Sequence, residues 1–485
     1  MGITRKELYS LISVITILIV ITFLTRFYGG ADILDYSDSA KFFADKYAAK
    51  IRSSHSYVYG LLHAIPISLT EGFFFFKITS LFSLLLIVYS VYRITNKNKK
   101  ALWLMLLSPI VWYMAPWISP IQTASLFFLW SHYFIRKYDH LSNVKYLLYA
   151  GLLAGLSWAF WDGVLFFIPF FALSFLYNKK LSHFIYFIIL VLVGSMPRLI
   201  LDQILFGFAF LGILRHILAS LTIALYGGIY SQSSLIGLSK FIITFVFIPI
   251  FSYLLFTKKI IKENKKTATF LIFSIIIIIL NSQVRFSLFV VPIIIASIAP
   301  YLSHKQFVLQ IAISLILILL VINPYLIQLR YSTNFSEFGA IPYIFPDIKL
   351  NSLFVEDLIK EDLKKVTEEY PNKTFVVGNN YESYRFLANI YWGDKVKEFV
   401  SIEDYKLNNS NNPKVFEKEF CSHIKISERR DFCTSVYIRK SFKDQTDYNK
   451  IEYALSDKDS LDLEGFSFVK KYKYLSLFKK SQPSA

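Results

Sequence analysis

The stretch from Tyr9 to Phe43, YSLISVITILIVITFLTRFYGGADILDYSDSAKFF, decides the fold class of this chain. Its first part, which ends at Leu24, is an apolar run close to the length that a helix needs to cross a bilayer. Two aspartates, Asp35 and Asp38, follow shortly after this run. An acidic segment that comes directly after a membrane-spanning helix lies at the membrane surface, so the sequence predicts a polar site there.

The composition of the whole chain is that of a polytopic membrane protein. Of the 485 residues, 55% are hydrophobic and 18% are aromatic, and the mean hydropathy is +0.47. These values exclude an ordinary soluble domain. Residues 1–323 contain only 10 Asp and Glu residues, and four of them lie at positions 32–45. Because a carboxylate beside a bilayer is costly, this local accumulation predicts a functional role.

The net charge of +18 indicates membrane topology and not nucleic-acid binding. Residues 324–485 are nearly neutral, with 25 Lys and Arg residues against 24 Asp and Glu residues. Residues 1–323 have 27 basic residues against 10 acidic ones, and therefore carry nearly all of the excess. Basic residues concentrated between apolar spans are the positive-inside signal of membrane proteins. No nucleic-acid partner is expected.

Apolar windows suited to crossing a bilayer recur through residues 1–323. The sequence predicts eleven such spans, approximately Tyr9–Leu24, Gly72–Tyr92, Ala101–Ala115, Ile121–Ile135, Tyr146–Phe160, Gly163–Tyr177, Leu181–Pro197, Leu238–Phe256, Thr267–Leu280, Phe286–Tyr301 and Phe307–Ile322. The predicted fold is an α-helical polytopic membrane domain over residues 1–323, followed by a small α/β domain over residues 324–485.

The Lys and Arg residues set the predicted orientation of these spans. The segments assigned to the cytoplasm hold 17 basic residues and only three acidic ones. With eleven spans the N-terminus is cytoplasmic, and the acidic first loop (27–56), a second loop (198–237) and the C-terminal domain are extracytoplasmic. Apolar residues within the second loop are expected to form interfacial or re-entrant helices. The protein is expected in the plasma membrane, in contact with its lipids.

The C-terminal domain has the local signals of an α/β unit. Helical periodicity covers Leu353–Glu369 and Tyr381–Trp392, and strands are predicted at Thr374–Val377, Val396–Ile402 and Phe466–Tyr474. The two cysteines of the chain, Cys421 and Cys433, both lie here. An extracytoplasmic domain permits a disulfide between them, and two separate thiols are the alternative.

The first loop has the residues for acid–base chemistry on a lipid-borne substrate. Asp38, with Asp35 beside it, is the candidate general base that takes a proton from an acceptor hydroxyl while its oxygen attacks a sugar carbon. Partial burial at a membrane face can raise the pKa of an aspartate towards the working pH. The alternative is an ordinary hydrophilic loop with scattered acids.

A lipid-phosphate leaving group also requires cations nearby. Four extracytoplasmic residues are candidates for binding this phosphate, namely Arg198, Arg215, His216 and Arg285. Guanidinium groups bind phosphate oxygens in pairs and stay charged when partly buried. The alternative is that these side chains extend to the interface from helix ends.

Three further residues are candidates for contacts with the acceptor or the sugar. Asp162 and Trp161 lie at the end of a predicted span, where Asp162 could instead cap the next helix and Trp161 could belong to an interfacial belt, as could Trp112, Trp117 and Trp158. His55 follows the acidic loop. Its spacing from Asp35 and Asp38 is not typical of a metal site, so no metal ligands are assigned.

These segments resemble the GT-C superfamily of integral-membrane glycosyltransferases, which includes the protein O-mannosyltransferases and the aminoarabinose transferases of lipid A. The first external loop in that family often reads Asp-Glu-x-x-Tyr before an alanine-rich helix, and Asp38-Ser39-Ala40-Lys41-Phe42 stands at that place. The stretch Gly151-Leu-Leu-Ala-Gly-Leu-Ser-Trp-Ala-Phe-Trp161 is similar to the family's glycine-rich span, and Arg285-Phe286 resembles the Arg-Tyr that opens a late span. Ser39, Phe42 and Trp161-Asp162 depart from the family pattern.

The resemblance implies an inverting transfer of a sugar from a polyprenyl- or dolichyl-phosphate donor to a protein, lipid or glycan acceptor on the external face. Asp38 would be the base, and Arg285 would lie near the donor phosphate. A divalent cation, Mg²⁺ or Mn²⁺, takes part in some relatives and not in others. Two other classes stay open, a transporter or flippase for a lipid-linked sugar and a non-catalytic membrane scaffold.

Overall fold

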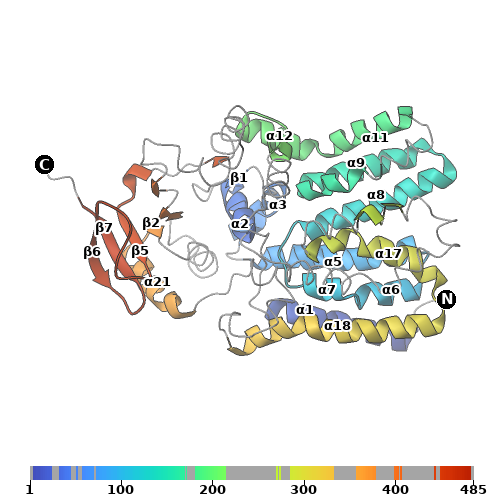
Figure 1. The fold of residues 1–485 in the computed structure, drawn as a ribbon, viewed down its shortest axis with the longest axis horizontal. Helices are drawn as coiled ribbons and strands as arrows, with labels where there is room; N and C mark the ends of the chain where they lie inside the picture. Colours follow the sequence, from blue (N-terminus) through green and yellow to red (C-terminus); the bar gives the residue numbers. More distant parts are fainter. Residues whose placement is uncertain are drawn as a thin grey trace.

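The computed structural model describes a helical bundle and a separate C-terminal sheet domain (Figure 1). The described residues are 4–24, 32–44, 51–52, 57–69, 73–169, 171, 181–214, 269–270, 272–274, 284–331, 357–377, 398–402, 405–406, 442–443 and 448–481.

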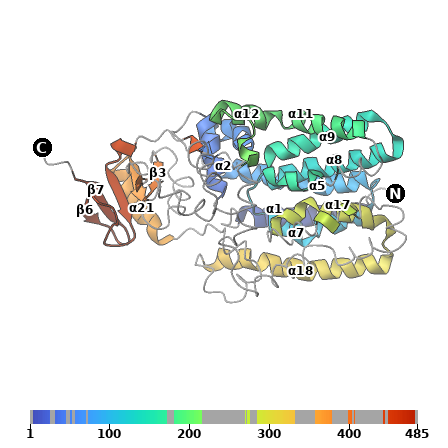
Figure 2. The same ribbon diagram turned by 45° about the horizontal axis from the view of Figure 1, so that its top comes forward.

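The bundle is built mainly from long helices that run along a common direction (Figure 2). Its described α-helices are α1 (Arg5–Leu24), α2 (Asp32–Phe43), α3 (Tyr57–Leu62), α4 (Ala64–Leu69), α5 (Phe74–Ile94), α6 (Lys99–Leu106), α7 (Pro109–Met114), α8 (Ile121–Leu141), α9 (Val144–Phe160), α11 (Leu181–Gly194), α12 (Met196–Phe206), α17 (Val291–Ile298) and α18 (His304–Tyr331). Short 3₁₀ helices are η1 (Asp162–Phe166), η3 (Val284–Phe289) and η4 (Ala299–Tyr301).

Several predicted spans are found as long helices, and others are interrupted. Among the described residues, α1 and α5 are each long and apolar enough to cross a membrane, and a third crossing is possible if α11 and α12 are one span bent by 55°. The predicted window 101–115 is two helices, because Pro109 begins α7 and cannot continue α6. The window 163–177 starts with the 3₁₀ helix η1. The total of eleven spans stays a prediction, and window 238–256 lies outside the described residues.

Glycines let two helices of the bundle approach each other closely. A Cβ placed on Gly155 of α9 would lie 2.1 Å from the carbonyl oxygen of Val191 on α11, and one on Gly194 would lie 2.2 Å from the carbonyl oxygen of Leu152. A Cβ on Gly151 would meet Leu190 Cβ at 2.5 Å. Small residues at helix crossings are how membrane helices bring their backbones together. This crossing fixes the ends of α9 and α11, which lead into η1 with Asp162 and into α12 with Arg198.

The two ends of the bundle are distinct. Lys99 at the start of α6 forms a 2.7 Å ion pair with Glu7 of α1, so the basic 93–100 segment and the N-terminus share one end, as predicted. The acidic helix α2 lies at the other end, on the side of the C-terminal domain (Figures 1 and 2). A two-residue antiparallel ladder joins β1 (Ile51–Arg52) of the first loop to β4 (Phe442–Lys443) of that domain. The first loop and the C-terminal domain therefore lie at the same end, as the charge pattern predicts.

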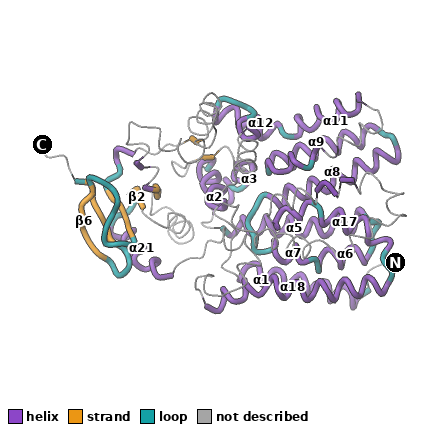
Figure 3. Tube along the Cα trace, viewed as in Figure 1, coloured by secondary structure: helices purple, strands orange, loops and turns teal. Residues whose placement is uncertain are grey.

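The C-terminal domain contains a five-stranded mixed sheet with helix α21 (Asp357–Glu369) packed beside it (Figure 3). The strand order is β3 (Glu398–Ser401), β2 (Thr374–Val377), β5 (Tyr453–Ser456), β7 (Ser476–Lys480) and β6 (Phe466–Lys471). Strand β2 is parallel to β3 and β5, and β7 is antiparallel to β5 and β6.

This sheet confirms the predicted α/β character of the domain, although β5 and β7 were not predicted. Predicted helix 381–392, Cys421 and Cys433 lie outside the described residues. Helix α18 continues to Tyr331, past the predicted domain boundary at residue 323.

Candidate functional site

The predicted acidic loop is a helix, α2, over the residues that include both candidate acids. Asp35 is buried, with 6% exposure, whereas Asp38 is partly exposed. The Ser39 hydroxyl donates to the Asp35 carbonyl oxygen at 2.7 Å within this helix. Of the two acids, Asp38 is therefore the one that a substrate can reach more easily.

Helix α2 rests on α3 through a close contact at Gly60. A Cβ on Gly60 would lie 2.5 Å from Ser39 Cβ and 3.0 Å from the carbonyl oxygen of Tyr36. Only a residue without a side chain permits this approach. The Tyr36 ring also meets the Tyr59 ring edge-on, at 5.6 Å between centroids. The orientation of the Asp38 helix is thus set by backbone packing against α3.

Beneath these helices lies a buried polar and aromatic layer. The Tyr59 hydroxyl forms a 2.8 Å hydrogen bond with Ser80 of α5. His63 stacks on Phe76 at 4.0 Å between ring centroids, and its Nε2 lies 3.0 Å from the Thr79 hydroxyl. Because their polar atoms have partners within the protein, these residues form a support for α2.

A buried ion cluster lies against Tyr57 of α3. Arg198 of α12 is only 1% exposed, and its Nη2 donates to Asp162 Oδ2 at 3.0 Å. Its Nε lies 3.6 Å from Asp202 Oδ1 on the same helix, and its guanidinium lies over the Tyr57 ring at 4.3 Å. Both acids are also buried. The cluster links η1, α3 and α12.

Asp162 does not cap the following helix. The residue at the N-cap of η1 is Trp161, and no side chain makes a capping hydrogen bond there. The Asp162 carboxylate instead accepts from Arg198 and from Trp158 Nε1, the latter at 3.2 Å. The capping explanation is therefore wrong. Arg198, expected at the donor phosphate, has carboxylates as its described charged partners.

Arg285 lies among aromatic rings close to this cluster. Its guanidinium carbon is 5.7 Å from the Trp117 ring and 5.7 Å from the Phe286 ring, and the side chain is partly exposed. Trp161 packs against Phe286 at 4.6 Å and stacks on Phe289 at 5.2 Å between centroids. Contacts therefore run continuously from Arg285 through Trp161 and Asp162 towards α3.

The tryptophans predicted to form an interfacial belt are mostly buried. Trp112, Trp117 and Trp158 are 1–5% exposed, and the indole of Trp112 donates to the Leu106 carbonyl oxygen at 3.0 Å. A belt residue faces lipid headgroups, so this explanation is wrong for these three. Trp161 is partly exposed and stays a candidate for contact with a sugar.

Lys77 is a cation that the sequence analysis did not select. It lies near the start of α5 and is 4% exposed, and its Nζ donates to the Thr22 carbonyl oxygen of α1 at 2.9 Å. A lysine within the apolar segment GFFFFKITS was the signal that could have identified it, since ionisable residues within spans are functional candidates by default.

His55, Arg215 and His216 lie outside the described residues. In the part of the chain that the structure describes, no group of three His, Cys, Asp or Glu side chains could hold a metal ion. Dependence of the protein on a divalent cation stays a prediction.

Comparisons with known proteins identify the fold of the chain. No protein-family description matches it, and none of the curated proteins does. Among solved structures, the chain is similar to ArnT from Cupriavidus metallidurans bound to undecaprenyl phosphate, with a TM-score of 0.56 and 10% identity over 98% of this chain and 99% of that one. The apo state of the same protein matches with a TM-score of 0.56 and 11% identity over 99% of this chain and 100% of that one. The chain therefore has the fold of ArnT along nearly its whole length, in agreement with the predicted GT-C-like architecture.

Proposed function

We propose that this membrane protein is a glycosyltransferase that takes its sugar from a polyprenyl-phosphate donor at the end of the bundle that carries α2. The main support is the similarity along nearly the whole chain to an ArnT structure bound to undecaprenyl phosphate. The partly exposed Asp38 on a helix at that end supplies a general base for such a reaction. The acceptor is a protein, a lipid or a glycan.

In the proposed reaction, Asp38 accepts the proton of an acceptor hydroxyl. The hydroxyl oxygen forms a bond to the anomeric carbon of the sugar while the bond from that carbon to the phosphate oxygen breaks. The lipid phosphate leaves with the electron pair, and attack from the opposite face inverts the anomeric configuration. General-base assistance of this kind contributes roughly 10²- to 10⁴-fold to a rate.

The departing phosphate gains charge, so cations near it stabilise the transition state. We assign this role to Arg285, whose side chain is partly exposed. Lys77 is 4% exposed and donates to the Thr22 carbonyl oxygen, so it is assigned no phosphate contact. Arg198 is assigned instead to hold Asp162, because its guanidinium is buried against that carboxylate. Trp161, which is partly exposed, would then face the acceptor or the sugar, and Asp162 would stay in the buried pair with Arg198.

The proposed topology places this reaction outside the cytoplasm of a plasma-membrane protein. The N-terminus and the basic 93–100 segment share the opposite end, which the positive-inside rule assigns to the cytoplasm. The C-terminal domain, joined to the first loop by β1 and β4, would cover the extracytoplasmic end and contribute to acceptor binding.

A flippase for a lipid-linked sugar is the second candidate. The 55° break between α11 and α12 favours it, since discontinuous helices form substrate sites in transporters. The break lies beside the buried pair of Arg198 and Asp162, however, and the partly exposed acid lies on α2. This arrangement suits chemistry at one face better than alternating access.

Transfer from a panel of radiolabelled polyprenyl-phosphate sugars, in membranes that contain the full chain, tests the proposal. Label moving to an acceptor in these membranes, and not in membranes without the chain, is the expected result. If no donor yields a product while label from one of them becomes accessible on the other side of sealed vesicles, the protein is a flippase.

Replacing Arg285 tests the phosphate role. We expect Arg285→Ala to raise KM for the donor by about 10- to 100-fold and to leave KM for the acceptor nearly unchanged, because a hydrogen bond to a charged group contributes about 1.5–3 kcal/mol. The matched control is Arg93→Ala, which removes an exposed arginine at the opposite end. An unchanged donor KM in Arg285→Ala would remove this residue from the phosphate site.

A further inference from the structure

The end of the bundle that is opposite α2 contains a hollow of about 330 Å³. It lies between the end of α5, where Ile94 and Asn96 line it, and the last turns of α8. Asn96 precedes Lys99, whose ion pair with Glu7 fixes this end as the one with the N-terminus. The hollow is therefore separate from the proposed glycosyltransferase site.

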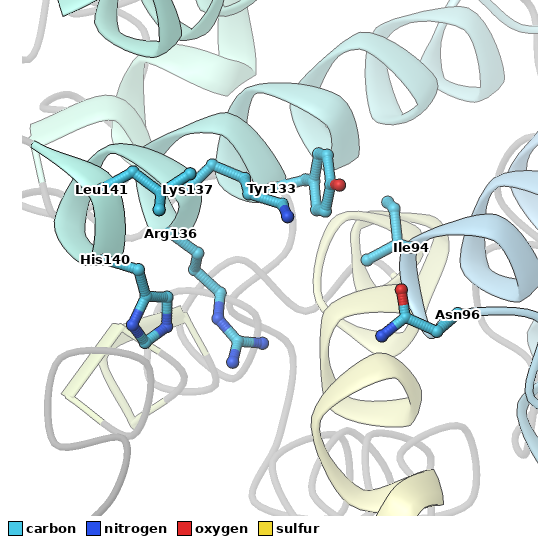
Figure 4. A pocket seen from close by; sticks show the side chains of 7 residues that line it. All are labelled: Ile94, Asn96, Tyr133, Arg136, Lys137, His140 and Leu141. Atoms are coloured by element: carbon cyan, nitrogen blue, oxygen red, sulfur yellow. The ribbon is translucent and has the colours of Figure 1, made fainter. Parts of the chain in front are cut away.

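Basic side chains from two turns of α8 line this hollow. Arg136, Lys137 and His140 take part, and Figure 4 shows Arg136 and His140 extending in the same direction from the helix, with Asn96 on the facing segment. None of the seven lining residues that the structure describes is acidic. Arg136 interacts electrostatically with Asp139 and Tyr301, which lie outside the lining. The hollow thus presents positive charge together with amide and phenol groups.

Apolar residues stand at the same place. Ile94 and Leu141 line the hollow, and Leu141, Tyr89 and Val144 are exposed large side chains nearby along α5, α8 and α9. An aqueous anion site does not need exposed apolar neighbours, whereas a lipid requires a polar pocket for its headgroup and an apolar surface for its chains. Basic pockets between membrane helices on the cytoplasmic side are suited to anionic headgroups.

The turn beside the hollow has an unusual backbone. Asn96 and Lys97 have φ angles of 54° and 61°, in the left-handed region that non-glycine residues rarely adopt. The residue that lines the hollow is the asparagine, which tolerates this conformation and presents an amide to a ligand. This conformation ends helix α5, because the Lys97 amide donates to the Tyr92 carbonyl oxygen at 2.8 Å as in a Schellman motif.

We propose that this hollow binds the headgroup of an anionic phospholipid from the membrane leaflet at the N-terminal end. The lipid phosphate lies among Arg136, Lys137 and His140, and its acyl chains follow the apolar surface of α5 and α8. The bound lipid holds the ends of these two helices together. It contributes to the stability of the bundle and takes no part in sugar transfer.

Lipid binding to the purified full chain in detergent tests this inference. Binding is measured by native mass spectrometry, and stability is measured by thermal unfolding. Each measurement is made with dioleoylphosphatidylglycerol, dioleoylphosphatidylcholine and inorganic phosphate. We expect the anionic lipid to bind and stabilise preferentially. The variant Lys137→Gln/His140→Gln should lose roughly fivefold in affinity, the effect of the one lysine cation that it removes together with the imidazole. Lys145→Gln, which removes an exposed cation near the same end but outside the hollow, should bind as the wild type does.

Three outcomes would overturn the inference. Equal binding of the two lipids would show that charge does not select the ligand. An equal loss in Lys145→Gln would show a diffuse surface effect. Stabilisation by inorganic phosphate as strong as that by the anionic lipid would make the hollow a free-phosphate site. The side chain of His140 is exposed and that of Lys137 is partly exposed, so their replacement leaves the helix packing intact. A loss of lipid binding in the variant is therefore not caused by a loss of folding.

Discussion

Asp38→Asn is expected to lower the rate of sugar transfer by about 10²- to 10⁴-fold, because the amide cannot accept the acceptor proton. The substitution keeps the size and shape of the side chain at a partly exposed position of α2, so folding and membrane insertion should persist. The measurement is the single-turnover rate with the best donor of the panel. KM for the donor should change little, since the base touches the acceptor and not the lipid phosphate.

The design of this test separates the two acids of α2. Asp35→Asn changes a buried side chain on the same helix and should affect thermal stability more than transfer. The matched control for lost charge is Asp457→Asn, an exposed acid of the C-terminal domain, which should transfer normally. Normal turnover in Asp38→Asn would remove it as the base, and a selective loss of turnover in Asp35→Asn would assign the role to that residue.

The elements that could be predicted from the sequence are those with a strong local signal. The long apolar runs of α1 and α5 needed only length and hydropathy. Helix α21 ends before Pro371, where periodicity and the proline agree. Strand β7, by contrast, was not predicted, because its segment SLFKK has too few residues for a clear alternation.

Interruptions within apolar segments were harder to predict. The window 101–115 is apolar throughout, and hydropathy alone gives one span. Pro109 disfavours a helical backbone conformation at Ser108, and this was a local signal for the break between α6 and α7. Pro197 likewise stands in the first turn of α12, where the chain bends by 55°. A proline within or at the end of an apolar window therefore marks where a helix breaks or bends.

The pairing of site residues depends on the fold and not on local pattern. Asp162 and Arg198 were each selected from the sequence, but as ligands for different parts of the substrate. Their 3.0 Å ion pair joins residues on η1 and α12, and it exists because Gly155 and Gly194 bring α9 and α11 together. No spacing rule in the sequence indicates such a contact. The structure consequently changes the proposed role of Arg198 from substrate binding to positioning.

Arg198→Met is expected to destabilise the protein by about 3–5 kcal/mol, since removing one partner of a buried ion pair leaves an uncompensated charge. Two buried carboxylates, Asp162 and Asp202, would lose their cation, and Tyr57 would lose the guanidinium that covers its ring. Methionine keeps much of the volume of the side chain, so the loss reports charge and hydrogen bonding more than a cavity. The measurement is thermal or denaturant unfolding in detergent.

A double-mutant cycle with Asp162→Asn decides between the two roles of Arg198. If the pair is structural, Arg198→Met/Asp162→Asn should be more stable than the sum of the single effects predicts, because the second change removes the charge that the first one left unpaired. Lys145→Met, at an exposed position, is the control for loss of a cation and should unfold as the wild type does.

If Arg198→Met instead keeps the stability of the wild type and raises KM for the donor, the guanidinium serves the lipid phosphate. In that case its 1% exposure must increase when the donor binds, because a phosphate cannot contact a side chain enclosed by Asp162, Asp202 and Tyr57. Unfolding and donor binding of this one variant therefore separate a residue that positions Asp162 from one that binds the leaving group.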